Sequence, residues 1–119
     1  MSSLGDIPGE ITIDQFQKVD IRVGRILSAK RLAGARKPAY ELRVDFGPDL
    51  GVKQSSAQIT VHYAPEELLG RLVLAVVNFP PRRIAGFRSE VLTLGVPDEA
   101  GNVVVISPTA EVPLGGRLF

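Results

Sequence analysis

The sequence predicts a single all-β domain, a five-stranded barrel with short helices, and two observations support this prediction. Short segments of alternating apolar and polar residues are separated by glycine and proline, which is the pattern of half-buried strands joined by turns. The chain has 119 residues, of which 45% are apolar and 23% charged, so it can bury one core but leaves no room for a second domain. We expect residues 12–119 to form this domain and residues 1–11 to be a flexible N-terminal segment.

The first expected elements are a short helix and a bent strand. Thr12 and Gln15 have the spacing of a capping box, which predicts a helix over residues 12–18. The period of two over residues 19–23 predicts a half-buried strand. Gly24 interrupts this strand, and a glycine at such a position marks the bulge or bend that a closing sheet requires.

Further strands and a second helix complete the expected order. Residues 40–46 alternate most regularly, whereas the strand expected at residues 52–61 carries polar side chains on both faces. Residues 64–70 are expected to form one or two helical turns, with proline at the first position and glycine after the last. The remaining strands are expected at residues 72–77, 90–94 and 102–106, the last two joined by a VPDEAGN turn. A helix between the third and fourth strands is the order of a five-stranded OB-fold barrel.

The connection between the strands at 72–77 and 90–94 carries the clearest functional signal. Pro80 and Pro81 fix φ and remove two backbone donors, so a stiff loop that does not pair in a sheet is expected here. Three cations follow without an intervening acid, namely Arg82, Arg83 and Arg88. Arginine makes planar, multi-donor contacts with phosphate and stacks on bases, which favours an RNA ligand. The plain alternative is a solvated connection whose charges only maintain solubility.

Other polar residues are candidates for the same ligand site. Arg36 and Lys37 lie in an expected loop, and with Arg43 and Lys53 they form either a second cationic border or a plain charged surface. The polar residues at 52–61 can pair with base edges or a peptide backbone, or they can form edge-strand hydrogen bonds. Asn78 either contacts the ligand or pins the backbone of the arginine-rich connection. The remaining candidates are Ser55, Ser56, Gln58, Phe87 and Ser89.

Several kinds of chemistry are excluded by residues that the sequence lacks. There is no cysteine, so disulfides, thiolate zinc sites and cysteine nucleophiles cannot form. His62 is the only histidine and has no partners at metal-ligand spacing. The sequence also has no G-x-S-x-G, G-x-x-x-x-G-K-[ST] or G-x-G-x-x-G motif. We therefore expect no catalytic residues, no metal and no cofactor.

Charge and hydropathy narrow the expected partners. A formal net charge of +1 argues against a highly basic protein that coats nucleic acid. Two tyrosines, five phenylalanines and no tryptophan offer few stacking platforms, so recognition of a folded RNA or an extended peptide is favoured over sequence-independent strand binding. The first residues lack the pattern of a secretory signal, and the longest apolar run, residues 72–77, is too short to cross a bilayer. A cytoplasmic protein without membrane insertion is therefore expected.

Two sets of residues resemble known families. The spacing of Asn78, Pro81-Arg82, Gly86 and Ser89 resembles the tRNA-binding domain found alone or appended to some aminoacyl-tRNA synthetases. Four longer runs resemble the CsaA proteins, small dimeric export-related chaperones, and these are ARKPAYELRVDFG (35–47), KQSSAQIT (53–60), VVNFPPR (76–82) and GGRLF (115–119).

The CsaA resemblance implies an OB-fold, a homodimer and a non-catalytic chaperone for protein export. Its implied ligands are tRNA, unfolded preprotein or both, and it raises a secretion motor ATPase as a candidate partner. The alternative is primarily a structure-selective tRNA-binding protein. The chain departs from the family pattern at Lys37-Pro38, where RNA-binding members often carry an acid-lysine pair.

The two ends of the chain independently predict a symmetric dimer. Residues 103–119 hold more apolar side chains than a finished barrel needs, and the helix at 12–18 is too short to bury Ile13 and Phe16. Large exposed apolar patches usually mark interfaces, and two-fold dimers are the commonest way to close one. We expect these N- and C-terminal extensions to form the interface. The alternative is that the C-terminal segment folds back across its own barrel.

Overall fold

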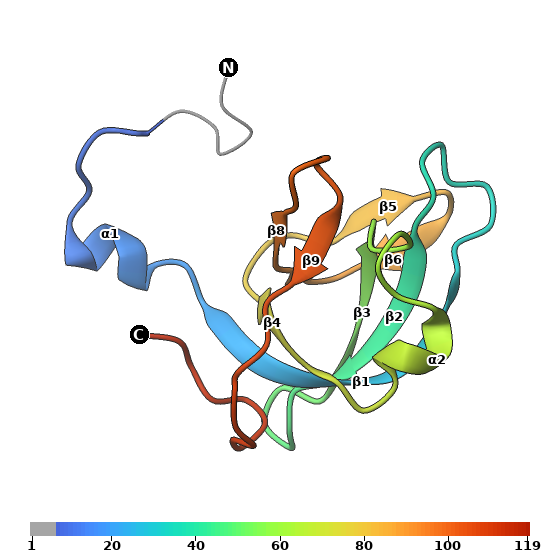
Figure 1. Cartoon of the computed structure of the whole chain (residues 1–119). Helices are drawn as coiled ribbons and strands as arrows, with labels where there is room; N and C mark the ends of the chain where they lie inside the picture. Colours follow the sequence, from blue (N-terminus) through green and yellow to red (C-terminus); the bar gives the residue numbers. More distant parts are fainter. Residues whose placement is uncertain (1–6) are drawn as a thin grey trace.

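Five strands form a curved antiparallel sheet in the computed structural model, which describes residues 7–119 (Figure 1). Their order is β3-β2-β1-β4-β7, with bounds Ile21–Arg31 for β1, Tyr40–Asp45 for β2, Val52–Ala57 for β3, Leu72–Val76 for β4 and Leu92–Thr93 for β7. The backbone N–H of Glu90, just before β7, donates to the carbonyl of Gln54 on β3 at 2.8 Å. The sheet is therefore a nearly closed barrel, and the predicted five-stranded OB-fold is confirmed.

Strand β1 is the longest element and runs through Gly24 without a break, so the expected interruption is wrong. A Cβ atom at Gly24 would lie 2.5 Å from Cγ1 of Val44 and 2.8 Å from Cε1 of Phe46. Gly24 is therefore required by close packing against β2. The predicted bulge lies further along, between Ile26 and Ser28, where the register with β2 shifts.

Two short helices flank the barrel as predicted. In α1 (Ile13–Gln17), the Thr12 hydroxyl accepts from the N–H of Gln15 at 3.1 Å, and the Gln15 side chain accepts from the N–H of Thr12 at 2.8 Å. No residue of α1 is buried against the barrel. Helix α2 (Pro65–Leu68) connects β3 to β4 and buries Leu68 completely in the core. No helix in the described part of the chain is both long and apolar enough to span a membrane.

Two hairpins lie outside the five-stranded sheet. Strands β5 (Arg82–Ile84) and β6 (Phe87–Ser89) pair with each other, so the expected unpaired loop after Pro80 and Pro81 is wrong. Both prolines precede β5, and the tight turn uses Ala85 and Gly86 with φ values of 51° and 81°. Strands β8 (Gly95–Pro97) and β9 (Val103–Val105) form the second hairpin, so the strand expected at 102–106 pairs outside the barrel sheet.

The C-terminal segment folds back along the first half of β1. The carbonyl of Gly116 accepts from the N–H of Val23 at 3.0 Å, and the N–H of Leu118 donates to the carbonyl of Ile21 at 2.9 Å. This is the arrangement that the monomeric alternative expected, yet the side chain of Phe119 remains fully exposed. The flexible segment expected over residues 1–11 lies largely outside the described residues.

Candidate nucleic-acid interface

A groove runs over the outer face of β2 and β3, between the loop that joins β1 to β2 and the β5–β6 hairpin. Its larger part has a volume of about 730 Å³, and a second part of about 380 Å³ continues along β2 and β3. The strand register places Leu42 opposite Ser55 on the inner face and Glu41 opposite Ser56 on the outer face. The face and the two flanking connections are those with which OB-folds bind oligonucleotides. We call this the cationic groove; its polar and charged lining residues are Ser28, Lys30, Arg36, Lys37, Glu41, Arg43, Gln54, Ser56, Gln58, Arg82 and Arg83.

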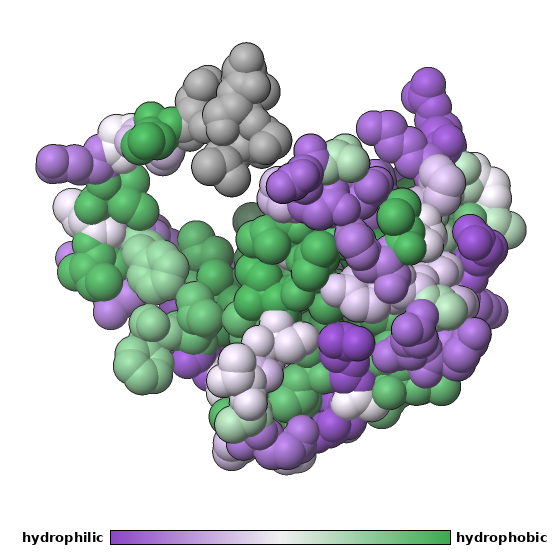
Figure 2. Space-filling view, viewed as in Figure 1, coloured by the Kyte–Doolittle hydropathy of each residue, from purple (hydrophilic) through white to green (hydrophobic). Residues whose placement is uncertain are grey.

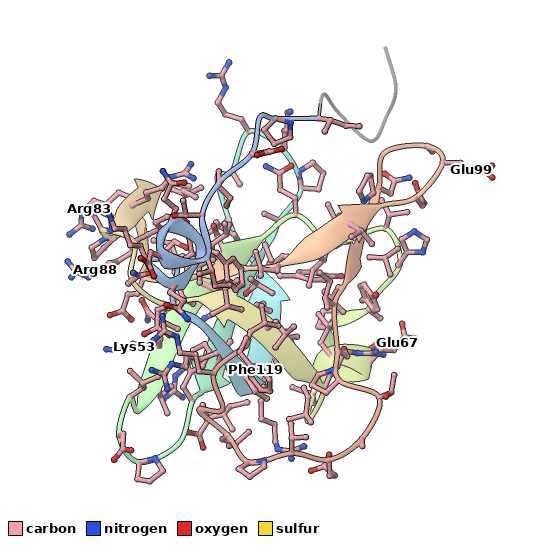
Figure 3. All side chains as sticks on the ribbon, turned by 90° about the vertical axis from the view of Figure 1, so that its left-hand side faces the viewer. Lys53, Glu67, Arg83, Arg88, Glu99 and Phe119 are labelled. Atoms are coloured by element: carbon pink, nitrogen blue, oxygen red, sulfur yellow. The ribbon has the colours of Figure 1, made fainter. Side chains whose placement is uncertain are left out.

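The charge of this groove is strongly one-sided. Six of its lining residues are lysine or arginine, and Glu41 is its only carboxylate. Glu41 is already paired with Lys30 at 3.1 Å. The formal net charge of the whole chain is only +1, so the rest of the molecule is net negative. Figure 3 shows this polarity, with Lys53, Arg83 and Arg88 on one side of the molecule and Glu67 and Glu99 on the other.

The β5–β6 hairpin brings two arginines into direct opposition. Arg83 on β5 pairs with Arg88 on β6, and side chains of directly paired residues lie on the same face. Among the residues that the structure describes, the Arg83 guanidinium donates only to the carbonyl of Gly86, at 3.3 Å. Within residues 7–119, neither arginine forms an ion pair with a carboxylate. The hairpin therefore presents two uncompensated cations side by side.

Most of the predicted ligand residues gather at this groove. The two expected cationic borders face each other across it, Arg36 and Lys37 from the β1–β2 loop and Arg82 and Arg83 from the hairpin. Phe87 lines the part next to Arg43 and Gln54. Ser56 and Gln58 lie on the floor between the borders, and Lys53 lies on the same side of the molecule (Figure 3).

The family comparison matches the part of the chain that builds this groove. The family model described as "Putative tRNA binding domain" matches residues 21–117, which include every strand and both cationic borders. The chain belongs to this tRNA-binding-domain family. The resemblance seen in the spacing of Asn78, Pro81-Arg82, Gly86 and Ser89 is thereby confirmed.

Relatives of this tRNA-binding domain include methionine--tRNA ligases and solved CsaA chaperones. Over 112 residues it is 39% identical to a "Methionine--tRNA ligase" of Porphyromonas gingivalis, an alignment that covers 94% of this chain and only 16% of the ligase. The crystal structure of the chaperone CsaA from Bacillus anthracis matches with 49% identity and a TM-score of 0.87, over 93% of this chain and 100% of that one. The CsaA chaperone protein from Picrophilus torridus matches with 45% identity and a TM-score of 0.85, over 92% and 100%. The resemblance to the CsaA proteins is confirmed.

Three predicted ligand residues of the tRNA-binding domain have structural partners instead. Ser55 is 0% exposed and its hydroxyl lies 2.8 Å from the hydroxyl of Thr93 inside the barrel, so it does not reach the groove. The hydroxyl of Ser89 is buried and accepts from the N–H of Ser56 at 2.9 Å, which caps the edge of β3. The Asn78 side chain accepts from the N–H of Asp20 at 3.0 Å and donates to the carbonyl of Lys18 at 2.7 Å. Asn78 therefore pins the connection between α1 and β1.

The groove also contains residues that sequence analysis missed. Ser28 and Lys30 on β1 and Gln54 on β3 line it beside Arg43. A signal was present in β1, because Ser28 and Lys30 are two residues apart and so point to one face of a strand. The alternation was followed only over residues 19–23, so Ser28 and Lys30 were not assigned to this strand.

His62 is not among the residues that line the groove. Its Nε2 lies 2.7 Å from Oδ2 of Asp98, which ties the β3–α2 connection to the β8–β9 turn. The hydrogen bond with His62, together with backbone donors from Asn102 and Ala100, lowers the pKa of Asp98 below its ordinary value. Within residues 7–119, no three His, Asp or Glu side chains gather as a metal site would require.

Proposed function

We propose that this protein is a non-catalytic cytoplasmic binding protein whose cationic groove holds tRNA. The observation that carries the proposal is the direct opposition of Arg83 and Arg88 without a carboxylate beside them. Like charges directly opposite each other destabilise a strand pair, so this arrangement costs stability unless an anion lies across both. A phosphate backbone supplies such anions at regular intervals, and Arg36 and Lys37 form the matching border on the far side of the groove.

The groove favours recognition of folded RNA over stacking on single strands. Its one aromatic lining residue, Phe87, is half-buried. Phe79 is 49% exposed but is not among the groove residues. Single-strand binding relies on successive aromatic platforms, whereas folded RNA is read largely through its shape and phosphates. A structured tRNA is therefore the ligand that this surface fits best.

The test is to measure tRNA affinity against salt concentration for the intact chain and for Arg82→Ala/Arg83→Ala. Each hydrogen bond to a charged group contributes about 1.5–3 kcal/mol, so we expect the double variant to lose at least tenfold in affinity. Its plot of log affinity against log salt should also be shallower by about one unit for each lost phosphate contact.

The matched control is Lys18→Ala, which removes an exposed cation outside the groove and leaves the Lys18 carbonyl available to Asn78. We expect its affinity and salt dependence to remain close to those of the unmodified protein. Equal affinities of the double variant and the unmodified protein, with both folded, would reject the proposal.

A second candidate is a CsaA-like chaperone for protein export that binds unfolded polypeptide. It is favoured by Ile84 and Phe87, which are half-buried on the hairpin beside the arginines and offer apolar contacts to an extended chain. Two solved CsaA chaperones of 45% and 49% identity support it as well. Acidic or neutral segments fit a cationic groove better than basic ones. Polypeptide held by apolar contacts should resist salt that releases tRNA, and competition between the two ligands would place both in one groove.

In this proposal the binding unit is a homodimer. Apolar side chains gather on α1, the C-terminal segment and the β8–β9 hairpin, and Figure 2 shows this band on one face of the molecule. Two copies would place two cationic grooves on one particle, which raises the effective concentration for a ligand that reaches both.

A further inference from the structure

A second cleft lies between the α2–β4 junction and the segment that follows β9. It has a volume of about 350 Å³, and its lining includes Arg71, Ser107, Thr109 and Glu111. None of its residues lines the cationic groove. A ligand here would therefore bind independently of one held by the arginines of the hairpin.

Two polar atoms in the lining of this cleft lack hydrogen-bond partners. Nε of Arg71 and Oγ of Ser107 are both buried, and neither forms a hydrogen bond within the described residues. Buried polar groups in folded proteins nearly always have a partner, and the exceptions point to a water or ligand that completes the site. The two residues that carry these atoms come from separate segments of the chain, and both line this cleft.

The guanidinium of Arg71 is held in position by an aromatic ring. Its Cζ lies 5.1 Å from the centroid of the Tyr63 ring. Tyr63 is itself fixed, because its hydroxyl accepts from the N–H of Val105 at 3.1 Å and its carbonyl accepts from the hydroxyl of Tyr40 at 2.7 Å. The cation is therefore oriented by stacking and leaves its donors free for another group.

The charges around the cleft select a monoanion. Glu111 also lines it, but Oε1 of Glu111 lies 2.6 Å from Nη2 of Arg25 and is already compensated. Arg71 is then the one uncompensated charge among the lining residues. A single negative charge would neutralise it, whereas a dianion such as phosphate would leave an excess negative charge beside Glu111.

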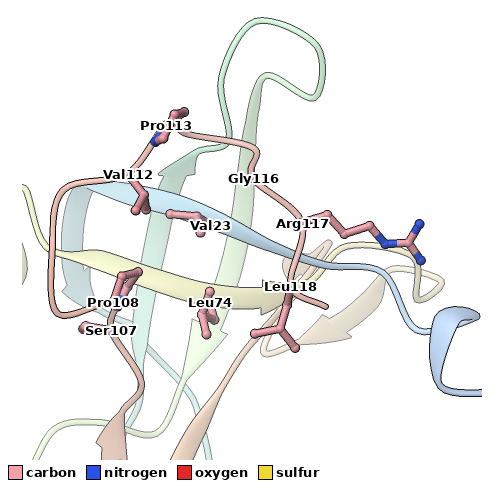
Figure 4. Close-up of a pocket in the computed structure, with 9 residues that line it drawn as sticks. All are labelled: Val23, Leu74, Ser107, Pro108, Val112, Pro113, Gly116, Arg117 and Leu118. Carbon is pink, nitrogen blue, oxygen red and sulfur yellow. The ribbon is translucent and has the colours of Figure 1, made fainter. Parts of the chain in front are cut away.

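We propose that this cleft binds a carboxylate through the Arg71 guanidinium and the Ser107 hydroxyl. A planar carboxylate matches the donor geometry of arginine, and the Ser107 hydroxyl can donate one further hydrogen bond. The group attached to the carboxylate is apolar, because Ser107 and Pro108 are shared with a neighbouring apolar pocket of about 380 Å³ (Figure 4). That pocket is otherwise lined mainly by Val23, Leu74, Val112, Pro113 and Leu118. A small branched acid and the C-terminus of a polypeptide that ends in an apolar residue share this chemistry.

The test is a titration of the intact chain followed by NMR of the arginine Nε–H groups at constant ionic strength. Four probes are compared: isovalerate, N-acetyl-leucine, N-acetyl-leucinamide and inorganic phosphate. We expect the Arg71 signal, assigned by its loss in Arg71→Lys, to shift saturably with the two carboxylates and not with the amide or phosphate. Tighter binding of isovalerate would identify a small acid as the natural ligand class. Tighter binding of N-acetyl-leucine would identify the C-terminus of a polypeptide as the natural ligand class. Either result supports the proposal.

Two variants separate a binding role from a purely structural one. Ser107→Ala should weaken carboxylate binding about tenfold, because it removes one hydrogen bond to a charged group. Thr60→Val, which removes a hydroxyl outside both sites, should leave this binding unchanged. Neither Arg71→Lys nor Ser107→Ala should alter tRNA affinity. The carboxylate site and the proposed tRNA-binding function can therefore be tested independently of each other. A flat titration with both carboxylates, or an equal response to phosphate, would overturn it and assign the two buried atoms to water.

Discussion

Asp98 shows how one side chain can hold two parts of the chain together. Its Oδ1 accepts from the N–H groups of Ala100 at 2.9 Å and Asn102 at 2.8 Å, which closes the β8–β9 turn. Its Oδ2 lies 2.7 Å from His62, on the connection between β3 and α2. These bonds favour the ionised carboxylate, and they lower its pKa in the folded state.

A pH dependence of stability follows from this lowered pKa. The unfolded chain binds a proton at Asp98 more readily than the folded chain does, so the contribution is complete above the unfolded pKa of about 3.9. It should be lost as the pH falls through the lower, folded value. We expect urea denaturation to show a deficit for Asp98→Asn at neutral pH that shrinks below about pH 4. Glu99→Gln, on the same turn, is the matched control, and a deficit for Asp98→Asn that stays constant with pH would contradict the assignment.

The roles of single residues were only partly predictable from the sequence. Alternation in β2 identified the strand correctly, because local spacing decides which face of a strand a side chain occupies. The same reasoning could not place Ser55, whose burial depends on Thr93 from a strand far along the chain. Gly24 was likewise recognised as a special position, but its cause is the packing of Val44 and Phe46 from β2. Contacts between distant segments are not visible in local patterns.

At the scale of elements, the β5–β6 hairpin is the feature that local rules misjudged. The two prolines indicated an unpaired loop, yet they stand before β5 and leave its backbone groups free to pair. The Ala85-Gly86 turn was the competing signal, since a glycine between short strand-like segments favours a hairpin. The charge of the segment was predicted correctly, and the hairpin explains why it matters, because pairing sets Arg83 beside Arg88.

This opposition predicts a conflict between stability and binding. Arg88→Glu replaces a repulsive cross-strand pair with an attractive one, so the free energy of unfolding should rise by up to about 1 kcal/mol, since the site is exposed. The same change places a carboxylate against the tRNA phosphates, and affinity should fall by more than tenfold. Urea denaturation and a tRNA binding titration measure the two effects. Lys18→Glu changes the net charge equally outside the groove and should produce neither, and a destabilised Arg88→Glu protein would contradict the argument.

At the scale of the molecule, the C-terminal segment folds back along its own barrel, as the monomeric alternative expected. Residues 115–118 hydrogen-bond to the free edge of β1 within the same chain. Apolar side chains at both ends of the chain nevertheless remain uncovered, since Phe119 is fully exposed and Ile13 on α1 is 68% exposed. The excess of apolar residues was readable from the sequence, whereas the edge to which the segment would pair was not. The backbone of this segment forms its hydrogen bonds within the chain, whereas apolar side chains remain exposed to solvent. Such an exposed apolar surface is suited to association with a second copy.

The last prediction is therefore a symmetric dimer that depends on side chains and not on the backbone of the C-terminal segment. Substituting Leu118→Ser/Phe119→Ser keeps the bond from Leu118 N–H to Ile21, so the variant should remain folded. It should sediment as a monomer where the intact chain sediments as a dimer. Leu69→Ser, at an exposed apolar residue beside α2 on the other side of the barrel from α1, is the matched control and should stay dimeric (Figure 1). Sedimentation of the intact chain as a monomer at every concentration would refute the dimer. If the dimer is confirmed, the monomeric variant should also bind tRNA more weakly although its cationic groove is unchanged, because it has lost the second groove.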